Sequence, residues 1–125
     1  MKPKKCTILL AEDNVINQEV AIDMLEIIGY KADVANNGKE AVEMCLKRHY
    51  DVILMDCQMP VMDGFDATRA IRNLEKTKKS KHIIIALTGN ALLGDKEKCL
   101  KTGMDDFLSK PFSYEELKAI LIKHI

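Results

Sequence analysis

Five short apolar runs, separated by segments with helical spacing, constrain the fold of this 125-residue chain more than any other feature. The runs are Cys6 to Ala11, Lys31 to Ala35, Asp51 to Met55, Ile83 to Leu87 and Asp106 to Ser109. The first, third and fourth are nearly continuous, a pattern typical of strands that are buried on both faces of a parallel sheet. The second and fifth are weaker, which predicts that they lie at the edges of that sheet.

The first segment between the runs favours a helix from about Asn14 to Ile28. Gly29 follows it and is a good residue for the turn after a helix. The spacing of apolar residues predicts that one side of this helix packs on the core. That side consists of Val20, Met24, Ile27 and Ile28.

Four further helices are expected: from Asn37 onward, from about Asp63 to Glu75, from about Ala91 to Thr102, and from Ser113 onward. Asn37 and Ser113 each have a glutamate three residues later, which resembles a capping box. Strands and helices therefore alternate, which predicts an α/β fold: a doubly wound parallel (βα)5 sheet with helices on both faces. The crossovers should be right-handed.

Length and charge limit the function classes. We expect residues 1–5 to form an N-terminal tail and residues 6–125 to form one domain. The 19 basic and 19 acidic residues give a formal net charge of zero, so we expect this domain to bind neither nucleic acid nor membrane surfaces. The apolar runs are too short to cross a bilayer, and the start of the chain does not resemble a signal peptide. These features favour a cytoplasmic domain.

The cysteines and histidines show no metal-binding spacing. The four cysteines include no C-x-x-C pair, so we expect reduced thiols rather than a zinc site or a disulfide framework. Strand alternation predicts that Cys57 is a packed thiol that points away from Asp56. We expect His49, His82 and His124 at the surface or at helix ends.

Residues with complementary chemistry follow four of the apolar runs. Glu12 and Asp13 come after the first, Asp56 after the third, Thr88 after the fourth and Lys110 after the fifth. In an open parallel sheet, ligands bind beyond the carboxyl ends of the strands. The sequence therefore predicts that these five side chains meet at one edge of the sheet.

Three carboxylates at one place repel each other unless something neutralises them. A hard divalent cation such as Mg²⁺, which prefers oxygen ligands, is the obvious partner. Thr88 adds a hydroxyl, and Lys110 adds a compact positive charge that can meet an anionic oxygen. A carboxylate nucleophile, a cation, a hydroxyl and an ammonium together indicate a phosphoryl-transfer site.

Four segments resemble those of response-regulator receiver domains, and the resemblance covers nearly the whole chain. They are LAEDN at 10–14, MDCQMPVMDG at 55–64, ALT at 86–88 and LSKPF at 108–112. The detailed pattern is closest to receivers attached to hybrid sensor histidine kinases. The resemblance implies a flavodoxin-like fold with strand order 2-1-3-4-5.

The resemblance also implies roles for individual residues. Asp56 would be modified, accepting a phosphoryl group from a phosphohistidine. Mg²⁺ or Mn²⁺ would be held by the carboxylates of Glu12, Asp13 and Asp56 and by the backbone carbonyl of Gln58. Thr88 and Lys110 would hold phosphoryl oxygens and take part in catalysis.

A switch is implied as well. Thr88 and Phe107 occupy the positions of the family's switch pair, and the surface of the fourth helix, fifth strand and fifth helix would report phosphorylation. The Lys110–Pro111 peptide bond would be cis.

By the same resemblance, the domain would catalyse its own phosphorylation and dephosphorylation. Its partners would be a histidine kinase, a histidine phosphotransfer domain, or both. We expect a monomer or weak dimer. The parent chain would be a hybrid histidine kinase, which can be anchored in a membrane.

Alternative functions remain open at this point. An aspartyl-phosphate phosphohydrolase usually carries an Asp-x-Asp pattern, but Gln58 stands two residues after Asp56. A nucleotide-binding module would need a glycine-rich phosphate loop, and neither common form is present. A receiver-like domain that acts only by constitutive protein contacts is the third alternative.

Overall fold

The structure, a computed structural model, describes residues 6–78, 81–89 and 94–125. The predicted tail at 1–5 and the first residues of the predicted fourth helix, 91–93, lie outside the described residues. The elements are, in chain order, β1 Ile8–Ala11, α1 Val15–Ile28, β2 Ala32–Ala35, α2 Gly38–Lys47, β3 Val52–Asp56, α3 Gly64–Lys78, β4 Ile83–Thr88, α4 Asp95–Thr102, β5 Asp106–Ser109 and α5 Tyr114–His124.

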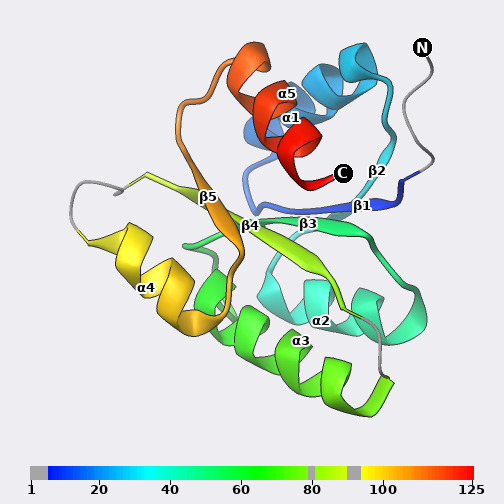
Figure 1. The fold of residues 1–125 in the computed structure, drawn as a ribbon, viewed down its shortest axis with the longest axis vertical. Helices are drawn as coiled ribbons and strands as arrows, with labels where there is room; N and C mark the ends of the chain where they lie inside the picture. The colour runs from blue at the N-terminus through cyan, green and yellow to red at the C-terminus, as the bar shows by residue number, and fades with distance from the viewer. Residues whose placement is uncertain (1–5, 79–80, 90–93) are drawn as a thin grey trace.

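The strands form one parallel sheet in the order β2-β1-β3-β4-β5, as predicted. The two weak runs, β2 and β5, are its edges (Figure 1). The three strong runs occupy the centre, where both faces are covered. Continuous apolar sequence suits this position because neither side of the strand meets water.

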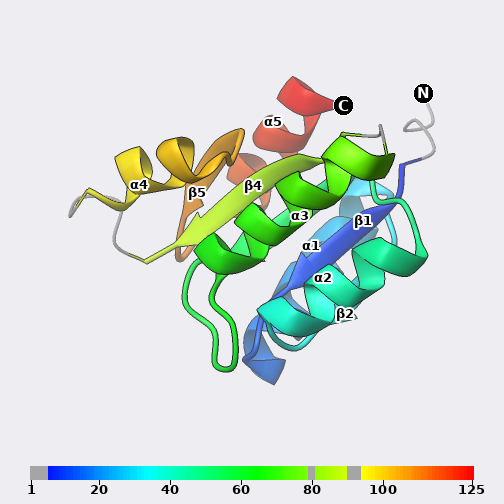
Figure 2. The same cartoon turned by 90° about the horizontal axis from the view of Figure 1, so that it is seen from below.

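The helices cover the sheet in two layers (Figure 1). α1 and α5 lie on one face; α2 and α3 lie on the other, with α4 beside β5 (Figure 2). Alternate residues of the strands pack on opposite faces of the sheet. Ile53 and Ile84 pack toward α2 and α3, whereas Leu54 and Ile85 pack toward α1 and α5. Each such fully buried side chain stabilises the fold by roughly 2 kcal/mol.

Local capping explains where several helices begin. Ser113 forms the full reciprocal capping box with Glu116 at the start of α5. At α2, the Asn37 side chain accepts a hydrogen bond from the Glu40 N–H at 2.8 Å, but the Glu40 carboxylate turns back to the N–H of Asn36. The second predicted capping box is therefore only half formed. The Glu40 carboxylate instead stabilises the turn after β2.

The predicted apolar side of α1 is partly wrong. Met24 and Ile28 pack against the core, but Val20 is 47% exposed and Ile27 is 71% exposed. The buried side of the helix instead centres on Ala21 and Leu25. Apolar residues occur nearly all around this helix, so their spacing did not single out the side that meets the sheet.

The predicted surface position of His82 is also wrong. Its side chain is 1% exposed, and its Nδ1 lies 2.7 Å from the carbonyl oxygen of Tyr50. The ring stacks on that of His49, with 4.9 Å between centroids. His82 precedes β4, and the approach of this segment to the start of β3 buries it. His49 is exposed and His124 ends α5, as predicted.

Candidate functional site

The predicted site residues meet at the carboxyl end of the sheet. The ammonium nitrogen of Lys110 lies 2.8 Å from Glu12 Oε1 and 2.8 Å from Asp56 Oδ2. Lys110 follows β5, Glu12 follows β1 and Asp56 ends β3, so these contacts join three strands. Lys110 and Glu12 stand 98 positions apart in the sequence. The parallel sheet brings them together because all its strands end on the same side.

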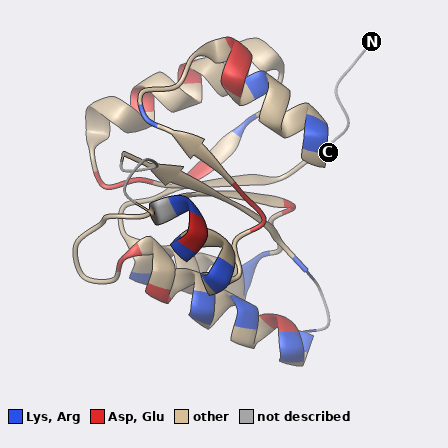
Figure 3. Ribbon diagram, turned by 60° about the vertical axis from the view of Figure 1, so that its left-hand side comes forward, with Lys and Arg blue, Asp and Glu red and all other residues tan. Residues whose placement is uncertain are grey.

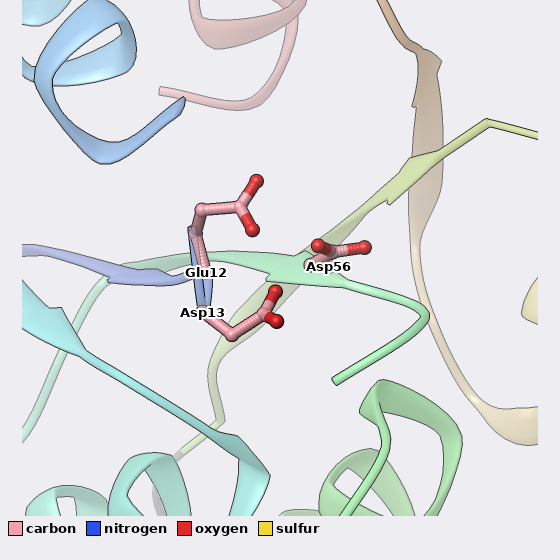
Figure 4. Close-up of side chains that lie close together, drawn as sticks. All are labelled: Glu12, Asp13 and Asp56. Carbon is pink, nitrogen blue, oxygen red and sulfur yellow. The ribbon is translucent and has the colours of Figure 1, made fainter. Parts of the chain in front are cut away.

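Three carboxylates turn toward one another at this edge (Figure 4). Glu12, Asp13 and Asp56 each offer an oxygen, and these oxygens all lie within 4.8 Å of one another. Mg²⁺ with ligand distances of about 2.1 Å places opposite oxygens about 4.2 Å apart, so small side-chain rotations would suffice. The donor atoms are all oxygens, which fits a hard divalent cation.

Burial sharpens the electrostatics of this cluster. Glu12 is 2% exposed and Asp56 is 6% exposed, whereas Asp13 faces solvent. Buried carboxylates need a counter-charge because burial removes the water that would otherwise solvate them. Lys110 supplies one positive charge against three negative ones. The cluster therefore keeps a net negative charge that attracts a cation.

The sequence did not identify Gln18 as a site residue. Its side-chain amide donates to the carbonyl of Glu12 at 2.6 Å and to the side-chain oxygen of Asn36 at 2.9 Å. The Glu12 N–H donates to the carbonyl of Ala35 at 3.0 Å. These bonds fix the turn that presents Glu12. An amide side chain in the first half of a helix was the available signal, but it does not indicate that its partners, Glu12 and Asn36, come from two different connections.

The loop after Asp56 is held close to the strand. The Gln58 N–H donates to Asp56 Oδ1 at 3.1 Å, and the Gly64 N–H donates to the carbonyl of Cys57 at 3.1 Å. A Cβ atom on Gly64 would lie 2.2 Å from the carbonyl oxygen of Asp56, so only glycine fits here. Val61 adopts a φ of 70°, which is strained for a β-branched residue.

Gly38, the first residue of α2, supports the same loop, and the sequence did not identify it either. Its N–H donates to the carbonyl of Met62 at 3.0 Å. A Cβ atom at this position would lie 2.3 Å from the same carbonyl oxygen. The first residue of α2 is therefore part of the support for the loop that follows Asp56.

A pocket of about 190 Å³ opens beside Asp56. It is lined by Asp56, Cys57, Gln58, Thr88, Gly89 and Lys110. Thr88 is 1% exposed, and its carbonyl accepts a hydrogen bond from the Lys110 N–H at 2.8 Å. The Lys110–Pro111 peptide bond is cis, as predicted. A carboxylate, a threonine and an ammonium thus surround one small space.

The charge of Lys110 is stabilised by its neighbours. Partial burial by itself would lower the pKa of this ammonium. Hydrogen bonds and attraction from Asp56 and Glu12 outweigh burial and raise the pKa above its usual value. Lys110 is therefore fully protonated at neutral pH and acts as a fixed positive charge.

Phe107 lies near the site but not in the pocket. It pairs with Ala86 across β4 and β5 and is half-buried against the core on the α2 and α3 side. The ammonium of Lys96 on α4 lies 5.1 Å from the centre of its ring. Its predicted role as a switch stays a prediction, and so does the metal-ligand role of the Gln58 carbonyl.

The sequence matches the family model of the response regulator receiver domain over residues 8–122. It is 51% identical over 125 residues to hybrid signal transduction histidine kinase B of Dictyostelium discoideum. That match covers 93% of this chain and 6% of the relative. It is 45% identical over 124 residues to histidine protein kinase 1 of Candida albicans, covering 93% of this chain and 5% of that one. The chain therefore spans a small part of these kinases.

The solved structures that are similar in fold and sequence include two receiver domains of particular interest. The receiver domain of a sensor histidine kinase from Pseudomonas aeruginosa, with a magnesium ion coordinated in its active-site cleft, superposes with a TM-score of 0.87. It is 48% identical, and the match covers 95% of this chain and 96% of that one. The receiver domain of Ssk1 from Saccharomyces cerevisiae, co-crystallised with the histidine phosphotransfer protein Ypd1, has a TM-score of 0.83. It is 36% identical, and the match covers 96% of this chain and 86% of that one.

Proposed function

Because this chain belongs to the response regulator receiver domain family, we propose that it is the phosphoaccepting domain of a phosphorelay, with Asp56 as the residue that is phosphorylated. One observation carries the assignment to this residue. Asp56 ends β3 beside a small pocket, and Lys110 from the far edge of the sheet contacts its carboxylate at 2.8 Å. An incoming phosphoryl group there meets a nucleophile and a fixed positive charge together.

The reaction that we propose is an in-line transfer. An Asp56 carboxylate oxygen forms a bond to phosphorus while the bond from phosphorus to a histidine nitrogen of the donor breaks. The electron pair of the broken bond stays on that nitrogen. Lys110 keeps its contact with the site and neutralises charge on the phosphoryl oxygens, and the Thr88 hydroxyl donates a hydrogen bond to one of them.

The acidic cluster would hold a divalent cation, Mg²⁺ or Mn²⁺. Its ligands would be the carboxylates of Glu12, Asp13 and Asp56 and the backbone carbonyl of Gln58. A bound cation supplies positive charge that stabilises the transferring phosphoryl group. The all-oxygen cluster described above supports this assignment.

The surface of α4, β5 and α5 would report the modification. Thr88 and Phe107 lie on neighbouring strands, and Phe107 packs beneath Lys96 of α4. When Thr88 engages the phosphoryl group, Phe107 would take a second position and α4 would adjust with it. Phosphorylation would thus shift the population between two arrangements of this surface.

A histidine phosphotransfer protein or domain is the partner that we propose, with a histidine kinase as the other possible donor. The start of α1 offers exposed apolar side chains next to the site: Val15 is 61% exposed and Ile16 is 70% exposed. The next residue, Asn17, lines an apolar pocket of about 260 Å³ together with Glu12, Val20, Phe112 and Lys110. A partner that covers this patch would bring its phosphohistidine to Asp56 and exclude water.

Location and context follow from the same proposal. Within the described residues, no helix is long and apolar enough to cross a membrane. We propose that the domain works in the cytoplasm as the receiver of a hybrid histidine kinase, since its relatives are parts of such kinases.

The central test is phosphorylation by a small donor. The chain is incubated with acetyl phosphate and Mg²⁺, and its intact mass is measured. We expect the wild type to gain the mass of one phosphoryl group, and chelation of Mg²⁺ to prevent this gain. Asp56→Asn should show no gain. Asp63→Asn is the matched control because Asp63 lies in the same loop and caps α3. A phosphoryl group on Asp56→Asn would overturn the assignment.

A second test separates docking from chemistry. Ile16→Asp should slow transfer from phosphorylated Ypd1 by at least about tenfold, the loss expected for an interface residue worth roughly 1.4 kcal/mol. Transfer from acetyl phosphate should not change. Ile122→Asp on α5 is the matched control, since Ile122 is 68% exposed on another helix. Equal loss in both variants would remove α1 as the docking surface.

A further inference from the structure

The thiols of Cys57 and Cys99 lie against each other, although 42 positions separate them in the sequence. Their sulfur atoms are 3.7 Å apart, and the residues are 2% and 0% exposed. A disulfide bond is about 2.05 Å long, so a movement of less than about 2 Å would allow one to form. None of the roles proposed above uses this pair.

Cys99 is the point at which α4 enters the core. Among the α4 side chains that the structure describes, it is the one that is buried. Lys and Glu residues occupy most of the rest of the helix surface (Figure 3). The ammonium groups of Lys96 and Lys98 lie 5.1 Å and 4.2 Å from the ring centres of Phe107 and Phe65. One buried thiol and two cation–π contacts therefore connect this helix to the rest of the domain.

Cys57 stands at the other side of the contact, in the loop that follows Asp56. It lines the 190 Å³ pocket beside that carboxylate. A small uncharged solute such as hydrogen peroxide that entered this pocket would come to lie next to Cys57. Of the four cysteines, Cys57 and Cys99 are the pair whose sulfur atoms the structure brings into contact.

We propose that Cys57 and Cys99 are an oxidative modification site, at which hydrogen peroxide forms a disulfide that fastens α4 to the phosphoacceptor loop. Peroxide first oxidises the Cys57 thiol to a sulfenic acid and releases one water. The sulfur of Cys99 then attacks the Cys57 sulfur, the S–S bond forms, and the hydroxyl leaves as a second water with the proton of the attacking thiol. The two thiols lose two electrons and two hydrogens, and peroxide is reduced to two waters.

The bond would act on the helix that borders the proposed switch residue. α4 carries Lys96, which packs on Phe107, so fastening α4 restrains the surface that would report phosphorylation. The disulfide itself needs only the two thiols and peroxide. It therefore stands or falls independently of whether Asp56 accepts a phosphoryl group.

The test begins with the full chain and hydrogen peroxide. Remaining thiols are blocked with N-ethylmaleimide, and the protein is digested with trypsin. We expect tryptic peptide 49–69, which holds Cys57, to be joined to peptide 99–101, and dithiothreitol to separate them. The intact chain should lose the mass of two hydrogens. The double variant Cys6→Ser, Cys45→Ser should still form the link, whereas Cys57→Ser and Cys99→Ser should not.

A second measurement tests the fastening of α4. Amide hydrogen exchange in α4 should slow by at least about tenfold in the oxidised wild type, because the tether opposes local opening. Peroxide-treated Cys57→Ser should show no such change. Recovery of alkylated Cys57 and Cys99 after peroxide treatment, or of their sulfinic acids without a link, would overturn the site. A link that leaves α4 exchange unchanged would overturn the fastening.

Discussion

The acidic side chains at the two ends of the parallel sheet have different surroundings. At the carboxyl end, three carboxylates crowd together around a single lysine ammonium. At the amino end, the carboxylate of Asp105 accepts from the Ile84 N–H at 2.8 Å, and that of Glu75 accepts from the His82 N–H at 2.6 Å. The guanidinium of Arg72 then joins both carboxylates, at 2.8 Å and 2.7 Å.

The difference teaches which end serves the fold and which serves a ligand. Arg72 also donates to the carbonyls of Gly103 and His82, so the amino end ties α3 to the segments before β4 and β5. Both carboxylates at this end contact the guanidinium, and each also accepts a hydrogen bond from a backbone N–H. The carboxyl end keeps an excess of negative charge that works against folding. Functional sites commonly carry such a stability deficit, because the missing charge is supplied by the ligand.

The largest effect on stability is expected from removing the Arg72 guanidinium, which contacts both carboxylates at the amino end. Arg72→Met should lower the free energy of unfolding by about 3 kcal/mol, since Glu75 and Asp105 would be left without their counter-charge. Urea denaturation measures this loss. Arg69→Met is the control on the same helix, where both side chains of the Arg69–Asp66 pair are more than half exposed (54% and 62%). That variant should lose less than about 0.5 kcal/mol. Similar losses in the two variants would contradict the comparison.

An intermediate effect of opposite sign is expected at the carboxyl end. Asp13→Asn should raise the free energy of unfolding in Mg²⁺-free buffer by about 1 kcal/mol, because it relieves repulsion from Glu12 and Asp56. It should also weaken Mg²⁺ binding by at least about tenfold. Thermal unfolding with increasing Mg²⁺ measures both quantities.

The matched control for this variant is Asp23→Asn, which makes the same change at an exposed position of α1. It should alter neither the unfolding temperature nor its dependence on Mg²⁺. If Asp13→Asn destabilises the Mg²⁺-free protein, the carboxyl end carries no excess charge that matters to folding, and the contrast between the two ends fails.

The smallest effect concerns pH at the amino end. The backbone N–H of Thr7 donates to Asp51 at 2.9 Å and is the main reason why the pKa of Asp51 lies below its usual value. A lowered folded-state pKa contributes stability above the unfolded value of about 3.9, and this contribution is lost as pH falls through the folded value. Asp51→Asn should therefore lower stability at pH 7.

The magnitude should stay below about 1 kcal/mol, because the Asp51 side chain is 48% exposed and solvent screens it. Urea denaturation from neutral pH down to the acid limb should show a shallower acid decline for Asp51→Asn than for the wild type. Asp66→Asn, at an exposed position, should keep the wild-type decline. If the acid decline of Asp51→Asn matches that of the wild type, Asp51 does not contribute to the pH dependence of stability.

Much of the fold was predictable because a central strand, which is buried on both sides, has a continuous run of apolar residues in the sequence. The run from Val52 to Met55 is continuous and apolar, and β3 indeed lies in the middle of the sheet. The site was predictable for a related reason. Asp56 and Thr88 come directly after such runs and Lys110 follows the weaker fifth run, and the parallel direction of the strands places their carboxyl-terminal residues at one edge.

Three features were not predictable. Gln18 was missed because its partners, Glu12 and Asn36, come from two different connections. His82 was misplaced because the residues that it contacts, His49 and Tyr50, come before the neighbouring strand β3. Cys57 was correctly expected to be a packed thiol, but nothing local indicates Cys99 as the residue that it contacts.

The sequence by itself determined the order of strands and helices, the central and edge positions, and which polar residues come after each strand, since these depend on short-range patterning and strand direction. Only the tertiary structure decided which side of α1 is buried, that Lys110 bridges Glu12 and Asp56, and that α4 rests on Cys57. The physical reason is that these contacts depend on the distances between elements, and side-chain packing across the whole domain sets those distances.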